Sequence, residues 1–183
     1  MRMGVLRRTF LVVACAVIAS CSGPFDWREF TWPEGELRVL LPDKPHRESG
    51  SVTIGGTPLT LTLFPVRVDG LSFAVGYAPL PAGLDAAGRA KLALAARNSF
   101  IGNLGAATPT TKAIAVGPSP GWSFAATATR DGKALAMAGR VVTTETRYYQ
   151  AIFVGPASRA GDAEVTLFLD SLVVGPDANR GSK

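Results

Sequence analysis

PLTLTLFPVRVDGLSFAVGYAPL, residues 58–80, is the stretch of the sequence that decides the fold. Leucines alternate with threonines over 59–63, which is the period of two expected of a strand with one buried face. A second apolar run, 71–80, follows directly after Asp69-Gly70, a pair suited to a tight turn. The stretch therefore predicts two strands that pair in an antiparallel hairpin.

Further runs of the same kind lie on both sides of this hairpin. The predicted strands are 36–41, 51–54, 111–116, 122–130, 134–144 and 147–154. Gly55-Gly56 suits a hairpin turn between 51–54 and the strand at 58–68. Asp131-Gly132 is a strong hairpin signal, because both central positions of that turn need a positive φ. Consecutive strands joined by tight turns predict an antiparallel sheet.

Two segments have a helical pattern instead. Residues 85–104 contain no proline and are rich in good helix formers, with Asp85 placed to cap the start and Gly102 or Gly105 placed to end the helix. Residues 160–172 are the second predicted helix. The buried stripes are Leu92, Ala96, Phe100 and Leu104 in the first helix, and Val165, Phe168, Leu169 and Leu172 in the second.

The sequence thus predicts an α+β fold: an antiparallel sheet of about seven strands flanked by two main helices, as in an α/β/α sandwich. We assign residues 34–175 to a single domain and 176–183 to a flexible polar tail. Val173-Val174 is predicted to return to the sheet. A hydrophobic content of 47% is ample for a core of this size.

The N-terminus has the features of an export signal. Residues 1–8 carry three arginines, and 9–20 form an uncharged run too short for a stable bilayer anchor. The run closes in Ile18-Ala19-Ser20-Cys21, which resembles the lipobox of bacterial lipoproteins. That resemblance implies a signal peptide at 1–20 and a diacylglyceryl group on Cys21. Ordinary secretion with cleavage nearby is the alternative.

Residues 21–33 are predicted to be the lipidated N-terminus and a short tether. Its aromatic residues, Trp27, Phe30 and Trp32, can dock on the domain or lie among lipid headgroups, and the short length favours docking. The resemblance to Gram-negative lipoproteins, with serine at position 22 in place of the aspartate that retains such proteins at the inner membrane, implies the outer membrane and the periplasm. Cys15 leaves with the signal, so the mature domain has neither a disulfide nor a free thiol.

The charge of the mature chain argues against nucleic-acid binding. The whole sequence has a formal charge of +5, but without Arg2, Arg7 and Arg8 it has 16 basic and 14 acidic residues, or +2. The remaining basic residues are scattered along the chain, whereas nucleic-acid binders cluster them on one face. We therefore expect no nucleic-acid partner.

The order of elements resembles the PsbP-like fold, named after the photosystem II extrinsic protein P. The similar motifs are LLPDKP at 40–45, RYYQA at 147–151 and FLDSL at 168–172, and the resemblance covers about residues 37–174. It implies an α/β/α sandwich around an antiparallel sheet, found in modules that are mostly non-catalytic accessory or binding proteins.

Few residues suggest catalysis or metal binding. His46 is the only histidine, too few for most metal sites, and we interpret it as a solvated loop residue. Ser119 lies in GPSPG, 117–121, which matches G-x-S-x-G in letters only, because a hydrolase elbow needs a strand before the serine and a helix after it. We interpret this segment as a turn, and expect no cofactor and no enzymatic activity.

Acidic and aromatic side chains give no stronger signal. Asp162, Glu164 and Asp170 are interpreted as surface groups of the second helix rather than as a glycosidase pair. Tyr148 and Tyr149 should point to opposite faces of their strand, so at most one of them can face a given site. We interpret them and Trp122 mainly as core residues.

Three hypotheses about function remain open. The first is a non-catalytic envelope lipoprotein that binds a protein partner as an accessory factor, which predicts an exposed apolar patch. The second is a carrier of a small ligand or lipid in a cavity between sheet and helix. The third, a hydrolase, is the least supported, since His46 and Ser119 are its only candidates.

Replacement of Cys21 tests the anchor. Cys21→Ala should move the protein from the membrane fraction to the soluble envelope fraction, because the acyl chains that hold it can no longer be attached. Continued sedimentation of the variant with membranes would refute lipid anchoring as the main tether.

Overall fold

The structure is a computed structural model that describes residues 23–106 and 108–180. The predicted signal peptide, with Cys15, and the lipidation site Cys21 lie outside the described residues, as do 181–183 of the predicted tail. Within the described part of the chain, no helix has both the length and the apolar character needed to cross a bilayer.

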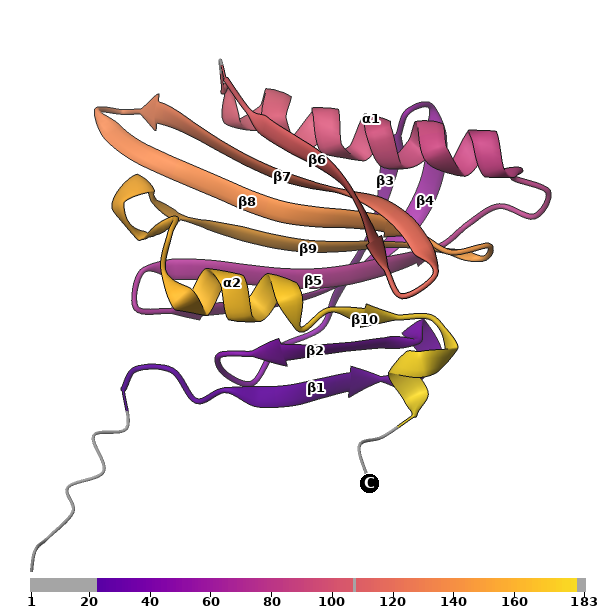
Figure 1. The fold of residues 1–183 in the computed structure, drawn as a ribbon, viewed down its shortest axis with the longest axis horizontal. Coiled ribbons are helices and arrows are strands. Elements are labelled where there is room, and N and C mark those ends of the chain that lie inside the picture. The colour runs from indigo at the N-terminus through magenta and orange to yellow at the C-terminus, as the bar shows by residue number, and fades with distance from the viewer. Residues whose placement is uncertain (1–22, 107, 181–183) are drawn as a thin grey trace, which may run out of the picture.

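Most of the molecule is organised around a seven-stranded antiparallel sheet (Figure 1). Its strands in spatial order are β3 (Glu48–Ile54), β4 (Thr57–Val68), β5 (Leu71–Pro79), β9 (Arg147–Pro156), β8 (Lys133–Thr143), β7 (Ser119–Arg130) and β6 (Thr110–Val116). Asp69 and Asp131 have φ of 50° and 51°, as the hairpin turns required. The predicted fold class, α+β with an antiparallel sheet of about seven strands and two main helices, is confirmed.

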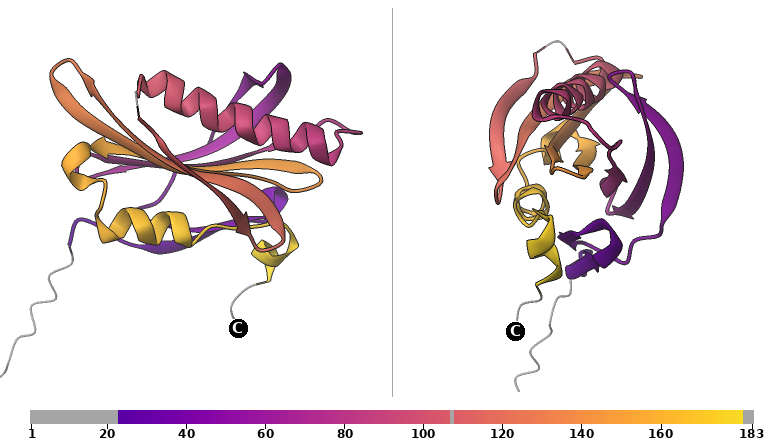
Figure 2. Two further views of the ribbon diagram at one scale, coloured as in Figure 1. Left: turned by 45° about the horizontal axis from the view of Figure 1, so that its top comes forward. Right: turned by 90° about the vertical axis from the view of Figure 1, so that its right-hand side faces the viewer.

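Helix α1 (Ala86–Leu104) covers one face of this sheet, with edge strands on either side of it (Figure 2). Its start is capped as predicted, because an Asp85 carboxylate oxygen accepts the N–H of Gly88 at 2.7 Å. Its end is at Gly105, whose φ of 75° is in the left-handed region. Of the predicted stripe, Leu92, Ala96 and Leu104 are buried, and Phe100 is partly buried against the same cluster.

A second, three-stranded sheet covers the opposite face together with helix α2 (Ala163–Asp170). It consists of β1 (Arg28–Trp32), β2 (Leu37–Leu41) and β10 (Val173–Val174), with β2 in the middle. We expected 36–41 to join the same sheet as the other strands, and this was wrong. The alternating burial of β2 is the same in either sheet, so its pattern did not reveal its partners.

The packed part of the chain extends beyond the predicted limits of 34 and 175. Strand β1 lies within the predicted tether, and the Asp26 N–H donates to the Pro42 carbonyl at 2.9 Å. The aromatic residues of this segment pack against the core, as docking required. The 3-10 turn η3 (Pro176–Asn179) lies within the predicted tail, yet its Ala178 is buried. Docking of the N-terminal segment agrees with the expectation, whereas the packing of the C-terminal turn was not indicated by the sequence pattern.

The second helix is shorter than the predicted 160–172. A 3-10 turn, η2 (Ala157–Arg159), precedes it, and α2 itself begins after Asp162. The four predicted stripe residues are all buried, although Leu172 lies beyond the end of the helix. The chain leaves α2 through Ser171 and Val173-Val174 returns to a sheet as predicted, although it pairs with β2 rather than with a strand of the large sheet.

The seven-stranded sheet separates two apolar clusters. One cluster lies between this sheet and α2 with the three-stranded sheet, and the other lies beneath α1. Tyr149 belongs to the first cluster and Tyr148 to the second, so the two tyrosines point to opposite faces as predicted. Both side chains are fully buried.

Truncation of Phe168 should destabilise the fold more than truncation of its neighbour. Phe168 is fully buried, and its ring meets Phe73 edge-on at 5.3 Å between centroids. Phe168→Ala should lower the free energy of unfolding by about 3–5 kcal/mol in urea titrations. Leu167→Ala, at a position 41% exposed, should change it by less than about 0.5 kcal/mol. Equal losses would contradict the assignment of Phe168 to the core.

Candidate functional site

A cavity of about 710 Å³ lies at one end of the large sheet. The first turns of α1, the β6–β7 hairpin, the β8–β9 turn and the chain after β10 form its walls. These segments meet there because Gly121 pairs with Val142, which brings the β6–β7 and β8–β9 turns to the same end of the sheet. Sites for small ligands commonly have volumes of roughly 300–1,000 Å³, so this cavity is large enough to bind one.

The walls of the cavity are mostly small or apolar. Helix α1 contributes Ala86, Ala90 and Ala93, and β6 contributes Ala113 and Ile114. Alanine side chains on one flank of a helix leave space next to a neighbouring strand, where larger side chains would fill the gap. The cavity is therefore a consequence of the alanine-rich composition of α1.

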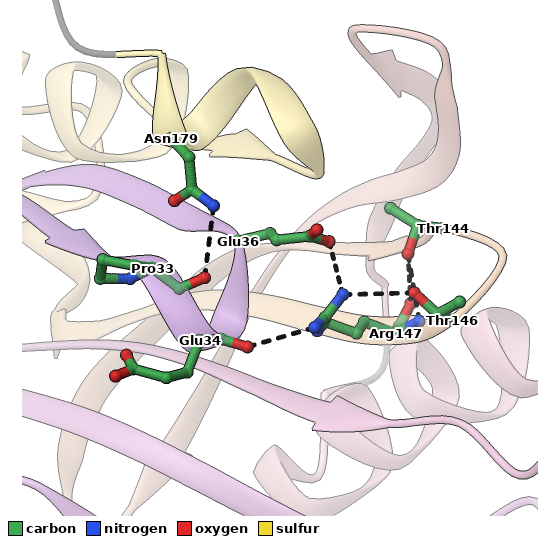
Figure 3. A network of polar contacts seen from close by, with 7 residues as sticks. All are labelled: Pro33, Glu34, Glu36, Thr144, Thr146, Arg147 and Asn179. Carbon is green, nitrogen blue, oxygen red and sulfur yellow. Dashed lines mark hydrogen bonds and ion pairs between the residues drawn. The ribbon is translucent and has the colours of Figure 1, made fainter.

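The ion pair between Arg147 and Glu36 lies beside the cavity (Figure 3). An Arg147 guanidinium nitrogen lies 2.5 Å from a Glu36 carboxylate oxygen, and a second guanidinium nitrogen donates to the Glu34 carbonyl at 3.2 Å. The Glu36 carbonyl accepts the N–H of Gly175 at 2.9 Å. These bonds join the three-stranded sheet to the start of β9, so both charged groups are held by structural contacts.

The hydroxyl of Tyr149 lies close to this network. It is buried, and it makes no hydrogen bond of normal geometry among the described residues, although the Gly175 backbone and the Thr144 side chain lie close enough to interact with it. Burial raises the pKa of Tyr149 to about 12, and Arg147, Thr144 and the backbone of Gly175 oppose that increase. Because Thr144 and Gly175 line the cavity, the hydroxyl lies just behind that part of the wall. A buried hydroxyl without a partner is a cost to stability.

The opposite side of the cavity carries an aromatic ring and two cations. Trp122 lines the cavity, and the Arg97 guanidinium of α1 lies over its ring at 4.3 Å from the centroid. Arg89, also in the wall, donates to the Leu84 carbonyl at 2.8 Å. A guanidinium over an indole ring is attracted by the electrons of the ring face. This side of the cavity is therefore positively charged.

The two residues considered for hydrolysis are far apart. Ser119 is buried in the wall of the cavity, where it begins β7; only Gly117 and Pro118 form the turn, and a strand follows rather than a helix. His46 is exposed in the loop between β2 and β3, where a ring nitrogen lies 2.7 Å from a Glu48 carboxylate oxygen. It is not among the residues that line the cavity, so the structure does not bring them together.

The acidic candidates are separated as well. Asp162 pairs with Arg159 and does not cap α2, whereas Asp170 pairs with Arg140 of β8. Glu164 is partly exposed in the first turn of α2. Within residues 23–106 and 108–180, no three His, Cys, Asp or Glu side chains gather into a group that could hold a metal ion.

Sequence reasoning missed most of this site. Glu36, Arg89, Thr144 and Gly175 come from four separate segments, and none lies in a recognisable motif. Trp122 was considered as a pocket residue, and it does line the cavity. Tyr148 and Tyr149 were considered with it, but neither is among the lining residues. The one useful signal in the sequence was the run of alanines in α1.

Comparison with known proteins does not assign a family. No family model and no curated protein matches the sequence. Among solved structures, cyanobacterial PsbP (CyanoP) from Synechocystis sp. PCC 6803 is similar over 90% of this chain and 99% of its own, with a TM-score of 0.45 and 9% identity. Values this low do not establish a shared fold, so the PsbP-like resemblance stays a prediction.

Removal of the Tyr149 hydroxyl should not weaken the fold. Tyr149→Phe should leave the free energy of unfolding at pH 7 unchanged or raise it by up to about 1 kcal/mol, because no hydrogen bond of normal geometry is lost. Tyr148→Phe is the control, since the Tyr148 hydroxyl donates to Gln150 Oε1 at 3.1 Å. That variant should lose about 1–2 kcal/mol.

Tyr149→Phe should also change how the free energy of unfolding depends on pH. Tyrosine in an unfolded chain ionises near pH 10, whereas the pKa of folded Tyr149 is raised to about 12. Unfolding therefore releases a proton between these values, and the free energy of unfolding falls as the pH rises from about 10 to about 12. Tyr149→Phe should make this fall shallower in urea titrations at each pH. An unchanged slope would contradict the burial of Tyr149.

Proposed function

We propose that this protein is a non-catalytic binding module of the bacterial cell envelope, held at a membrane by acyl chains on Cys21. In a Gram-negative cell it would face the periplasm from the outer membrane. The single observation that carries the binding role is the open, largely apolar cavity at the end of the large sheet. Its occupant, in this proposal, is part of a protein partner for which the module is an accessory factor.

The chemistry of the cavity supports binding rather than catalysis. Three acidic residues line it: Glu36 pairs with Arg147, Asp177 pairs with Arg180, and Glu145 has no ion pair among the described residues. Ser119 has no histidine beside it among the lining residues, and one unpaired carboxylate without a nucleophile or a second acid–base group does not make a catalytic set. The residues that line the cavity offer shape, apolar surface and charge, which are the properties of a recognition site.

The apolar patch that we expected of a protein-binding module is absent from the described surface. Its exposed large hydrophobic side chains are Leu94 of α1 and Leu167 of α2, which lie on helices that cover opposite faces of the sheet. Two separated leucines do not form a docking surface. In this proposal, the cavity and its rim take the role that the patch was expected to have.

A carrier of a small apolar ligand is the second candidate. The volume of about 710 Å³ and the alanine-lined wall favour it. The two candidates differ in their occupant, a polypeptide side chain or a free molecule. Crosslinking from inside the cavity together with native mass spectrometry separates them.

A photocrosslinking amino acid at Ala90 is the decisive test. Ala90 lines the cavity, whereas Ser99, an exposed residue two and a half turns further along the same helix and therefore on its opposite side, does not. In cells, the probe at Ala90 should capture one discrete envelope protein, and the probe at Ser99 should not. Equal capture at both positions would place the contact outside the cavity and contradict the proposal.

The complementary variant is Ala90→Trp, which fills the cavity from an exposed helix position. It should abolish the complex without loss of folding. If native mass spectrometry instead finds a small molecule that Ala90→Trp releases, the carrier function replaces the accessory function. If neither a protein nor a small molecule is found, the proposal is wrong.

A further inference from the structure

Strand β6 is one edge of the seven-stranded sheet. It pairs with β7 on one side only, and its first four residues, 110–113, are exposed. Every edge strand turns half of its backbone N–H and C=O groups away from its neighbour, where an extended segment can bind them. Ala113 and Ile114 also line the cavity, so a segment paired with β6 would pass its mouth.

Most of the charges close to β6 are positive, although Glu36, Glu145 and Asp177 also line the cavity that β6 borders. Residues 86–144, which contain α1 and β6 to β8, carry seven Lys or Arg residues and a single acidic residue, Asp131. The sequence suggested that basic residues were scattered, but the fold places these in one part of the molecule. Three of them flank β6: Lys112 lies on the strand itself, Arg97 lies over Trp122, which pairs with Ala113, and Arg89 lines the cavity.

These three cations lack acidic partners. The lysine and arginine side chains that form ion pairs in the described part of the chain are Arg28, Arg38, Arg140, Arg147, Arg159 and Arg180. None of them involves Arg89, Arg97 or Lys112. Cations that no internal carboxylate neutralises attract an anionic partner, and neutralisation by that partner adds to the affinity and specificity of binding.

We propose that β6 is a docking edge for an extended, acidic segment of a partner protein. This inference rests on the proposed function and specifies its partner. The backbone of the segment pairs with β6, its Asp and Glu side chains lie near Lys112, Arg97 and Arg89, and one of its side chains enters the cavity.

The other sheet edges fit such a segment less well. Strand β3, the opposite edge of the large sheet, begins with Glu48. Strand β1, an edge of the small sheet, contains Glu29 and follows Asp26. These acids already have cationic partners, since Glu48 lies against His46, Glu29 against Arg38 and Asp26 against Arg28, and neither strand lines the cavity. Only β6 among these three edges combines an exposed backbone, flanking cations and the adjacent cavity.

A displayed library of random short peptides, selected on the purified detergent-solubilised protein, tests this inference. The enriched peptides should have an excess of Asp and Glu. Hydrogen exchange with a synthetic enriched peptide should show slowed exchange in residues 110–116 and no change in β3. Lys112→Glu alone should weaken binding at least threefold, and Lys112→Glu with Arg97→Glu at least tenfold, on the order of 1.4 kcal/mol.

The matched control is Lys44→Glu with Arg67→Glu, two exposed cations with no ion pair in the described structure that lie outside the β6 region. This pair changes the net charge equally and should alter binding by less than twofold. No enrichment, enrichment without acidic residues, protection outside β6, or equal loss in the control would each overturn the inference.

Two other occupants would overturn it in a recognisable way. Protection of β6 that depends on protein concentration and needs no peptide would assign the edge to a second copy of the chain. Binding of phosphatidylglycerol vesicles that Lys112→Glu abolishes, with no peptide enriched, would assign it to a membrane. If Ala90→Trp abolishes the cellular complex while charge reversal has no effect, the proposed function stands and this inference alone fails.

Discussion

The fold depends on the pairing of β5 with β9 at the centre of the large sheet. Strands β3 to β5 form one meander and β6 to β9 form another, and this pair of strands is the only ladder between the two meanders in the described chain. Because β9 is the last strand of its meander, α1 must carry the chain from β5 to the far edge. Four strand spacings are roughly 19 Å, which a helix of 19 residues readily spans. The route of α1 leaves β6 at the edge and the cavity at its side.

The attachment of the three-stranded sheet to the seven-stranded sheet is the second contact on which the fold depends. Gly35 approaches the ring of Tyr77 so closely that a Cβ atom would lie 2.8 Å from the ring carbons, so only glycine fits there. The Trp32 indole N–H donates to the Tyr77 hydroxyl at 3.2 Å. Together with the pair of Glu36 and Arg147, these contacts fix one end of the small sheet against β5 and β9. The wall of the cavity formed by Glu36 and Gly175 is positioned by the same contacts.

Local sequence signals predicted the helices, strands and turns, but they did not predict which strands would pair with one another. The turns at Asp69 and Asp131, the cap at Asp85 and the stripe of α1 each depend on neighbouring residues, and all were found from the sequence. Assignment of β2 to a separate sheet depends on β1 and on the two residues of β10, more than a hundred positions away. The cavity has the same origin: its walls come together only after both sheets have formed. The spacing of residues along the chain therefore cannot predict contacts between segments that are so far apart in the sequence.

The two ends of β2 have different neighbours, and this sets how the molecule would stand on a bilayer. Near Leu41 the incoming chain is held through Asp26, and beyond Leu37 lies Glu36 in the cavity wall. An acylated Cys21 would be five residues, at most about 17 Å of extended chain, from Asp26. The length of β2, roughly 15 Å, separates this end of the strand from the cavity at its other end. A lipidated copy would therefore be tethered at the end of β2 that is remote from the cavity.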